Sequence, residues 1–592
     1  MTLPQALAFS VVGGAVVVFA WGRFRYDVIA LIALLTGVVV GVVPAKNAFS
    51  GFTSDVVVII ASALVISAAV GRSGVIEQLL QPVLSRLKTS ATQVPVLAGS
   101  TAVLSMVTKN VGALAILMPV AIRLARTTKT SRSSLLMPMS FMSLLGGLVT
   151  LVGTSTNIIV SQVREDTLGK PFQMFDFAPV GLVLTAIGLI FVSFGWRLLP
   201  RDRQGAPDMG EALSAPYVVE ATLPESWPVE LATLGDLKLA GAGVKATAIV
   251  RAGKPLATLR ADRKLQPGDT LVLEGDQEAL NAVFTRTPLM HERAGKEVER
   301  EEAREELRSI EAVVQRESVL VGRSAGRLQL QEQFGVNLLA LSRSGARISE
   351  QLRNVTLRPG DVLILQAGEK ALPGALQSLG VLPLIERPVQ VEGASRRYVP
   401  ILILTLAMIL VAFKVAPVAP AFFGAAVLMV ASGSLSMREA YGSLEAQVLV
   451  LIGALTPLSV AVQTTGGTGL IAGGLAVLLH GAPALLTLGI LMLTAMACAP
   501  FLHNAPTVLV LAPIGVALAR QLHLQPDAFL MAVATGAGCD FLTPIGHQCN
   551  TLVMGPGGYR FGDYARLGLP LSILVIGLGP PLIAFVWPLV GR

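Results

Sequence analysis

The stretch Lys109-Asn110-Val111-Gly112-Ala113 precedes an apolar run that passes a proline and ends in Leu-Ala-Arg. Far along the chain, His503-Asn504-Ala505-Pro506-Thr507 precedes a run that ends in the same way. A second pair follows, in which Thr150 to Asn157 and Thr543 to Asn550 each contain a glycine and end in asparagine. In a membrane protein, such breaks at matching points of two halves mark interrupted helices that bind ions or substrate. The repeat therefore predicts a transporter.

The composition is that of a membrane protein. Of the 592 residues, 53% are hydrophobic and only 14% are charged, with a mean hydropathy of +0.67, whereas a soluble domain carries about 25% charged residues. Basic residues that stay on cytoplasmic loops and face anionic lipid explain the net charge of +8. We therefore expect membrane lipid, and no nucleic acid, as a partner. The three cysteines lack metal-ligand spacing, so no cofactor or metal is predicted beyond sodium.

A helix needs about 20 apolar residues to cross the hydrocarbon core of a membrane, and both ends of the chain supply such segments. The first membrane repeat, residues 1–198, has predicted spans near 4–21, 27–45, 54–71, 91–108, 111–125, 134–151 and 177–196. The second membrane repeat, residues 396–592, has predicted spans near 399–413, 418–434, 446–463, 483–500, 505–519, 528–546 and 566–588. Asn110 and Asn504 each lie between two apolar runs without a long loop, which predicts hairpin tips that line a cavity or are buried in protein.

The central segment is charged and predicts two small soluble α/β modules, at 205–288 and 313–388. Each module has alternating strand patterns and a Pro-Gly-Asp turn, at 267–269 and at 359–361, that reverses the chain without a ligand. The residues between the modules, 289–312, are dense in Glu and Arg and predict an exposed helical linker.

Basic residues predict the orientation in the membrane. Arg23 and Arg25 follow the first span, and Arg72 follows the third, which places these loops inside. The loop of the second half that corresponds to the latter, 464–469, carries no charge. Matching repeats with opposite charge bias predict inverted topology in the inner membrane, with the soluble modules in the cytoplasm.

These motifs resemble the divalent anion/sodium symporters, a family of sulfate, dicarboxylate and citrate carriers. The similarity rests on the two asparagine tips, on residues 146–157 and 540–551, and on 555–564, which resemble the ending of a bacterial branch. The central modules resemble the TrkA-C (RCK C-terminal) domains that members of that branch carry. The resemblance implies a polytopic α-helical membrane protein of two inverted repeats with re-entrant hairpins and broken helices. It also implies a homodimer that works by alternating access.

The resemblance further implies that the tips and the glycine loops form the transport site. Residues expected to contact substrate through the tips and loops are Asn110, Val111, Gly112, Thr154, Asn504, Ala505 and Asn550. Residues expected at the coupling-ion sites are Asn110, Gly153, Asn157, Asn504, Gly546 and Gln548. Physical chemistry agrees, because a dehydrated cation needs the oxygen ligands of an unwound segment, whereas helix N-termini offer N–H donors to an anion.

The flanks of the tips depart from the Ser-Asn-Thr pattern of the family. Lys109 and Val111 replace both hydroxyls at the first tip, as His503 and Ala505 do at the second, which disfavours the usual pair of sodium sites. The Lys109 ammonium either takes the charge position of a sodium ion or extends to the membrane interface. His503 either carries a coupling proton or is a neutral, hydrogen-bonded side chain.

Four further residues each leave two alternatives. Asp540 is either an ion or proton site or a neutralised or paired structural carboxylate. His547 either donates a hydrogen bond to an anionic substrate or packs its own loop. Arg251 and Arg343 occupy matching positions of the two modules, where they either bind a small nucleotide ligand through its phosphate or belong to exposed turns.

We therefore expect a secondary active transporter for a small divalent anion, sulfate or a di- or tricarboxylate, coupled to sodium or protons and regulated by its modules. The alternative is an ion channel or ligand-gated membrane sensor that the modules control. It is disfavoured because the sequence has no pore signature. An enzyme is disfavoured because no nucleophile and base are arranged as a catalytic pair.

Overall fold

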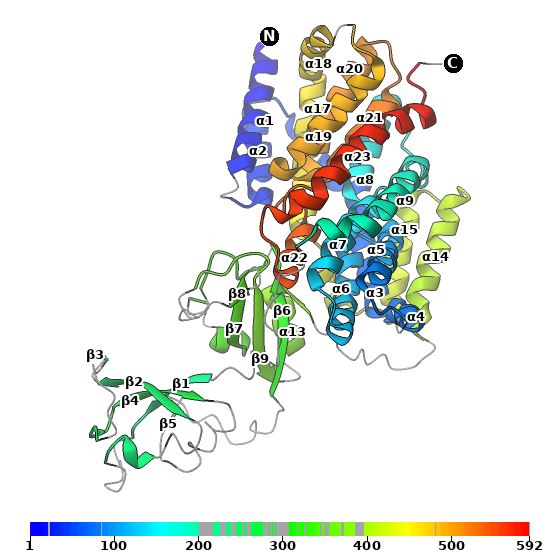
Figure 1. Ribbon diagram of the computed structural model, residues 1–592. Helices are drawn as coiled ribbons and strands as arrows, with labels where there is room; N and C mark the ends of the chain where they lie inside the picture. The colour runs from blue at the N-terminus through cyan, green and yellow to red at the C-terminus, as the bar shows by residue number, and fades with distance from the viewer. Residues whose placement is uncertain are drawn as a thin grey trace.

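The computed structural model describes residues 1–200 and 396–590 except positions 22, 23, 85 and 480, most of 307–384, and parts of 217–291. The two terminal segments form one helical body, and the central segment forms two small sheets at one end of it (Figure 1). This arrangement agrees with membrane helices interrupted by a soluble insertion.

Nine helices are described in the first terminal segment. They are α1 (Leu3–Trp21), α2 (Tyr26–Val39), α3 (Asp55–Arg72), α4 (Val75–Leu84), α5 (Ser90–Val107), α6 (Asn110–Thr128), α7 (Arg132–Gly147), α8 (Ser155–Leu168) and α9 (Ala178–Gly195).

The second terminal segment repeats this succession. Its helices are α14 (Val399–Ala412), α15 (Val418–Ala431), α16 (Met437–Ser443), α17 (Ala446–Thr464), α18 (Gly467–Leu478), α19 (Ala484–Leu502), α20 (Asn504–Gln521), α21 (Pro526–Gly538), α22 (Gln548–Gly557) and α23 (Asp563–Val586). The order of long and short helices from α17 to α23 matches the order from α3 to α9. Both predicted tips are present, because α5 and α6 are separated by two residues, and α19 and α20 by His503 alone.

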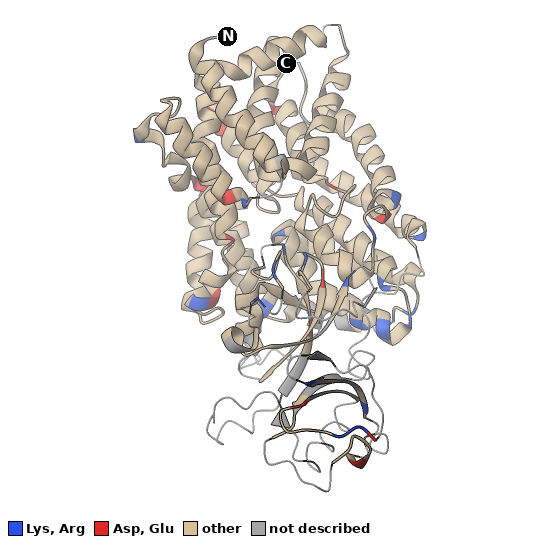
Figure 2. Cartoon of the chain, turned by 90° about the vertical axis from the view of Figure 1, so that its left-hand side faces the viewer, with Lys and Arg blue, Asp and Glu red and all other residues tan. Residues whose placement is uncertain are grey.

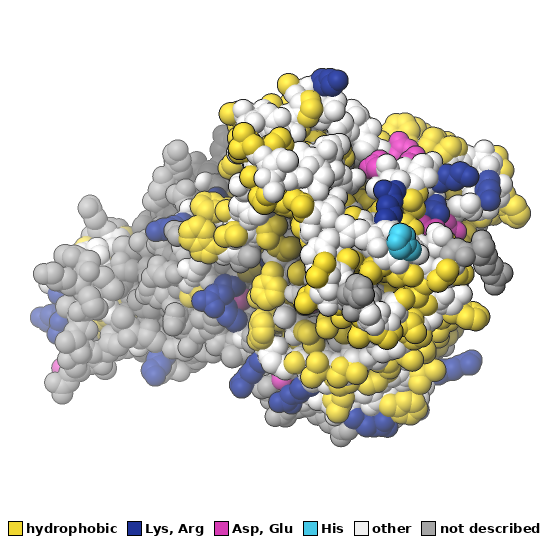
Figure 3. All heavy atoms as spheres, turned by 90° about the horizontal axis from the view of Figure 1, so that it is seen from above, with side chains coloured by type: hydrophobic (Ala, Val, Ile, Leu, Met, Phe, Trp, Pro, Cys, Tyr) yellow, Lys and Arg dark blue, Asp and Glu magenta, His cyan; other side chains and the backbone are white. Residues whose placement is uncertain are grey.

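Among the described residues, seven helices are long and apolar enough to cross a membrane. Charged residues are sparse within the helical body and more frequent toward the sheets (Figure 2). Large apolar side chains such as Leu35, Ile190 and Phe585 are exposed on the body, and Figure 3 shows apolar side chains over much of its visible surface. The chain is therefore a multi-pass membrane protein.

Several helix ends differ from the predicted spans. Helix α7 ends at Gly147 rather than at 151, and α21 ends at Gly538 rather than at 546, because the glycine loops that follow are not helical. Helices α4, α8, α16, α18 and α22 were not predicted. They are too short to span a membrane, and α8, Ser-Thr-Asn-Ile-Ile-Val-Ser-Gln-Val-Arg-Glu-Asp-Thr-Leu, is also largely polar.

Two antiparallel sheets of five strands form the central segment. The first has the order β3-β2-β4-β1-β5, with β1 (Tyr217–Thr222), β2 (Lys245–Arg251), β3 (Lys254–Pro255), β4 (Thr270–Gly275) and β5 (Met290–His291). The second has the matching order β8-β7-β9-β6-β10, with β6 (Leu307–Val314), β7 (Asn337–Arg343), β8 (Ala346–Arg347), β9 (Val362–Gly368) and β10 (Val381–Pro383). Helices α12 (Leu330–Phe334) and α13 (Leu372–Leu379) belong to the second module.

The prediction of a helical linker at 289–312 is wrong at both ends of that range. Met290 and His291 form β5, and residues from Leu307 onward form β6. The reason is the alternation of Ile310, Ala312 and Val314, which places these side chains in the core of the second sheet. Residues 292–306 of the predicted linker lie outside the described residues.

Candidate functional site

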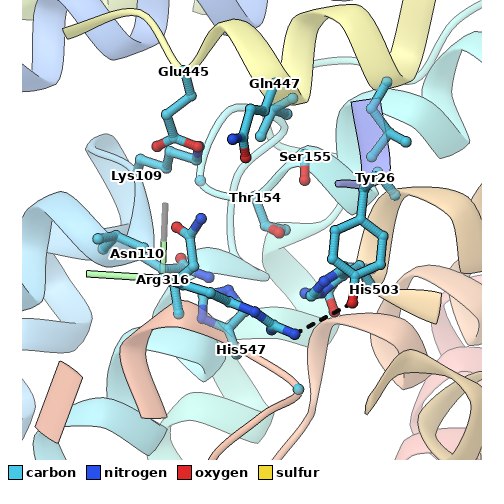
Figure 4. A pocket seen from close by; sticks show the side chains of 18 residues that line it. Tyr26, Lys109, Asn110, Thr154, Ser155, Arg316, Glu445, Gln447, His503 and His547 are labelled. Carbon is cyan, nitrogen blue, oxygen red and sulfur yellow. Dashed lines mark hydrogen bonds and ion pairs between the residues drawn. The ribbon is translucent and has the colours of Figure 1, made fainter. Parts of the chain in front are cut away.

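A cavity of about 130 Å³ lies where the two terminal halves meet (Figure 4). Residues 109–111 and 503–505 of the two tips line it, together with 153–155 and 546–548 of the two glycine loops. The remaining lining residues are Tyr26 of α2, Glu445, Gln447, Val448 and Leu451 at the start of α17, and Arg316 of the second module. Both halves of the sequence repeat thus contribute to one site.

Four helices begin at this cavity. Their first residues are Asn110 of α6, Ser155 of α8, Asn504 of α20 and Gln548 of α22. The first N–H groups of a helix have no partner within the helix, and the helix dipole places partial positive charge at that end. Four such ends around one small cavity favour an anion as its occupant.

The first tip holds its lysine in an ion pair. Lys109 Nζ lies 2.6 Å from Glu445 Oε2, at the start of α17, and both side chains are partly buried. The Asn110 amide contacts Ser105 Oγ. When the amide is turned so that its oxygen and nitrogen exchange places, the nitrogen donates to the carbonyl oxygens of Ser143 and Gly153 at 3.1 and 3.0 Å. Lys109 therefore lies at the cavity rather than at the membrane interface.

The second tip is shorter and more strained. His503 alone links α19 and α20, with φ of 67° and ψ of 161°, a backbone region that is almost reserved for glycine and costs about 1–3 kcal/mol. Its ring meets the Tyr26 ring edge to face, with centroids 4.2 Å apart. The Asn504 Oδ1 atom is buried and has no hydrogen-bond partner among the described residues, so this oxygen is available to a ligand.

Four of the site residues predicted in the membrane halves do not line the cavity: Gly112, Asn157, Asp540 and Asn550. Asn157 Nδ2 donates to the carbonyl oxygens of Leu148 and Thr150, and Asn550 Nδ2 donates to those of Asp540 and Thr543. Both asparagine side chains therefore hold the backbone of the glycine loops by hydrogen bonds and do not line the cavity. Gly112 lies against α3, where a Cβ atom would collide with Ser67 Oγ.

Two titratable side chains accompany the second glycine loop. The Asp540 carboxylate is buried, and neither of its oxygens has a hydrogen-bond partner in the part of the chain that the structure describes. It lies directly against Gly546, where a Cβ atom would collide with it. His547 Nδ1 accepts from the backbone N–H of Cys549 at 3.1 Å, which leaves Nε2 as the donor available to the cavity. An unpaired buried carboxylate behind a small cavity is typical of an ion or proton site.

Arg251 and Arg343 lie in the soluble modules and have the same structural partner. Each guanidinium donates through Nε and Nη2 to the aspartate of its Pro-Gly-Asp turn, Asp269 or Asp361, at 2.7–2.8 Å. Each also donates to a backbone carbonyl, of Lys264 or Thr356. This geometry gives both arginines a role in the module fold and does not favour the predicted nucleotide role.

Sequence reasoning missed five polar residues of the cavity: Tyr26, Ser155, Arg316, Glu445 and Gln447. Glu445 gave a weak signal, as a carboxylate at the start of an apolar span. Arg316 gave none, because it is one arginine among many in a charged segment. Among the described residues, no group of three His, Cys, Asp or Glu side chains could hold a metal ion.

Comparisons with known proteins place these features in context. The sequence profile of the citrate transporter family matches residues 16–499 and 479–591. An uncharacterised transporter of Synechocystis is 28% identical over 98% of this chain and 97% of its own length. The uncharacterised transporter YfbS of Escherichia coli is 29% identical over 98% of both chains. Sodium/sulfate cotransporter 1 of Chlamydomonas reinhardtii is 24% identical over 61% of this chain and 43% of its own.

Proposed function

This chain belongs to the citrate transporter family, and on that premise we propose that it is a secondary active transporter for a small divalent anion. The substrate is sulfate or a di- or tricarboxylate, coupled to sodium or protons and moved across the inner membrane by alternating access. Family and relatives are transporters rather than enzymes. The Chlamydomonas relative is named a sodium/sulfate cotransporter, which supports sulfate and sodium as the first pair to test.

The convergence of four helix N-termini on one cavity carries this proposal. Two of these ends come from each half of the repeat, as expected for a site at the interface of two repeats. The cavity is also small, about 130 Å³, which suits a compact anion. Asn110, Thr154, Asn504 and His547 offer the polar side chains that would orient it.

We assign the coupling cation to the second half. Within the described residues, Asn504 Oδ1 and both oxygens of the Asp540 carboxylate have no hydrogen-bond partner. A sodium ion could be coordinated by either group, whereas a proton would bind only the carboxylate. In the first half, the Lys109 ammonium already occupies the tip and is paired with Glu445. This asymmetry supports one coupling site, with Lys109 as a fixed charge in place of the second.

The soluble modules are proposed to be cytoplasmic and regulatory, as the basic loops of the first half suggest. The homodimer implied by the family resemblance is retained as part of the proposal. The matching succession of helices in the two halves supports the repeat, and the opposite charge bias of the matching loops supports its inverted topology.

The test is uptake of labelled sulfate, succinate and citrate into proteoliposomes under imposed sodium or proton gradients. Saturable uptake driven by one gradient is expected. Asp540→Asn should lower the gradient dependence at least about tenfold, whereas Asp176→Asn, away from the cavity, should not. An ohmic current that does not saturate would contradict the carrier and favour the channel alternative.

A further inference from the structure

One cavity residue comes from the soluble segment rather than from the membrane halves. Arg316 follows strand β6 of the second module and reaches between the two tips (Figure 4). Its Nη1 donates to the carbonyl oxygen of Ile545 at 2.5 Å, and its Nη2 donates to Tyr26 Oη at 3.3 Å. The side chain thus contacts α2 and the second glycine loop at once.

The second module is held in the position that delivers this arginine. Glu311 of β6 is fully buried and accepts from Arg126 Nη2 of α6 through both carboxylate oxygens, at 3.1 and 2.9 Å. Gly360 of the Pro-Gly-Asp turn lies directly against α22, where a Cβ atom on Gly555 would collide with the Gly360 carbonyl oxygen. Val313, Val362 and Leu384 of the module belong to the apolar core of the helical body.

The charges of the cavity give Arg316 a distinct role. Lys109 is neutralised by Glu445, whereas no ion pair joins Arg316 to a carboxylate among the described residues. A guanidinium has five N–H donors, and the hydrogen bonds to Ile545 and Tyr26 use only part of this capacity. Its planar fork also matches the oxygens of a carboxylate or sulfate group.

We propose that Arg316 is an anion-binding residue of the transport site, supplied by the second soluble module. The inference rests on the proposed function and deepens it. The ligand is a small oxyanion, sulfate or carboxylate, that receives a charge-assisted hydrogen bond from the guanidinium. Substrate affinity then depends on docking of the module, because undocking removes the Arg316 guanidinium from the cavity.

The experiment compares anion uptake by the full-length wild type, Arg316→Gln and Arg316→Lys in proteoliposomes. Loss of a hydrogen bond to a charged group predicts an increase of about tenfold or more in KM for Arg316→Gln, with little change in maximal rate. Arg316→Lys should show a smaller increase, because lysine keeps the charge without the fork. Arg323→Gln, an exposed arginine of the same module, is the matched control and should behave as wild type.

Two outcomes would contradict the role of Arg316, and a third would contradict the proposed function. An unchanged KM in Arg316→Gln overturns the inference, and so does increased uptake, which would mean that the arginine blocks the cavity. Thermal stabilisation of the purified variants by sulfate or succinate checks the same affinities without transport. If the wild type neither takes up nor is stabilised by any of the anions, the proposed function itself fails, and this inference fails with it.

Discussion

The two soluble modules have one fold and two different relations to the membrane part. Their sheets share the same strand order, the same irregularity in the pairing of the second strand with the fourth, and the same Arg-to-Asp hydrogen bonds. The first module has a separate apolar core and lies beyond the second, away from the helices (Figure 1). The second shares core residues with the helical body.

The second module, which packs against the helical body, differs from the first module at a position that reaches the cavity. Leu223 and Val314 occupy the same position, because both donate to the aspartate carbonyl of the Pro-Gly-Asp turn. Two residues later the second module has Arg316, whereas the first has Glu225, which lies outside the described residues. The fold of a module therefore does not determine docking, and particular side chains on its surface do.

The largest expected effect follows from removing the buried carboxylate of the second module. Glu311→Ala leaves Arg126 without its carboxylate partner and should weaken docking by about 3 kcal/mol. Hydrogen exchange of backbone amides in β6 and α22 measures this directly, and the KM for the anion should increase as in Arg316→Gln. Glu220→Ala, at the corresponding position of β1, should leave α22 unchanged; equal exchange in both variants would refute the difference between the modules.

A smaller effect is expected at the glycines of the two turns. Gly268 and Gly360 have φ of 82° and 83°, so alanine should cost each module about 1–2 kcal/mol of local stability. Only at Gly360 does the new Cβ atom also meet the membrane part, at 3.2 Å from the Thr551 carbonyl oxygen. Uptake should therefore fall in Gly360→Ala but not in Gly268→Ala. A transport defect in Gly268→Ala would show that the first module also contacts the carrier.

The smallest effect should be the same in both modules. Arg251→Lys and Arg343→Lys keep the charge but lose the two-pronged bond to aspartate, which costs about 1 kcal/mol in either module. Hydrogen exchange in β4 and β9 is the measurement. If a cyclic dinucleotide protects these strands in the wild type but not in the lysine variants, the result supports the nucleotide-ligand alternative for both arginines.

The sequence predicted where the helices of the site are interrupted better than it predicted which side chains contact one another there. Both tips and both glycine loops were placed correctly, because glycine, proline and lone polar residues in apolar runs interrupt helices. The roles of Asn157 and Asn550 were not separable from those of Asn110 and Asn504, since all four are asparagines at repeat positions. Only the tertiary structure separates them, because Asn110 and Asn504 line the cavity whereas Asn157 and Asn550 do not.

The sequence by itself determined that this is a membrane protein with two similar halves, interrupted helices and a duplicated soluble insertion. Those features depend on composition and local periodicity, which are properties of contiguous residues. Only the tertiary structure paired Lys109 with Glu445, 336 positions apart, and brought Arg316 to Ile545, 229 positions apart. Such contacts depend on how whole helices and modules pack, so no local pattern encodes them, and they are the contacts that set the charge of the cavity.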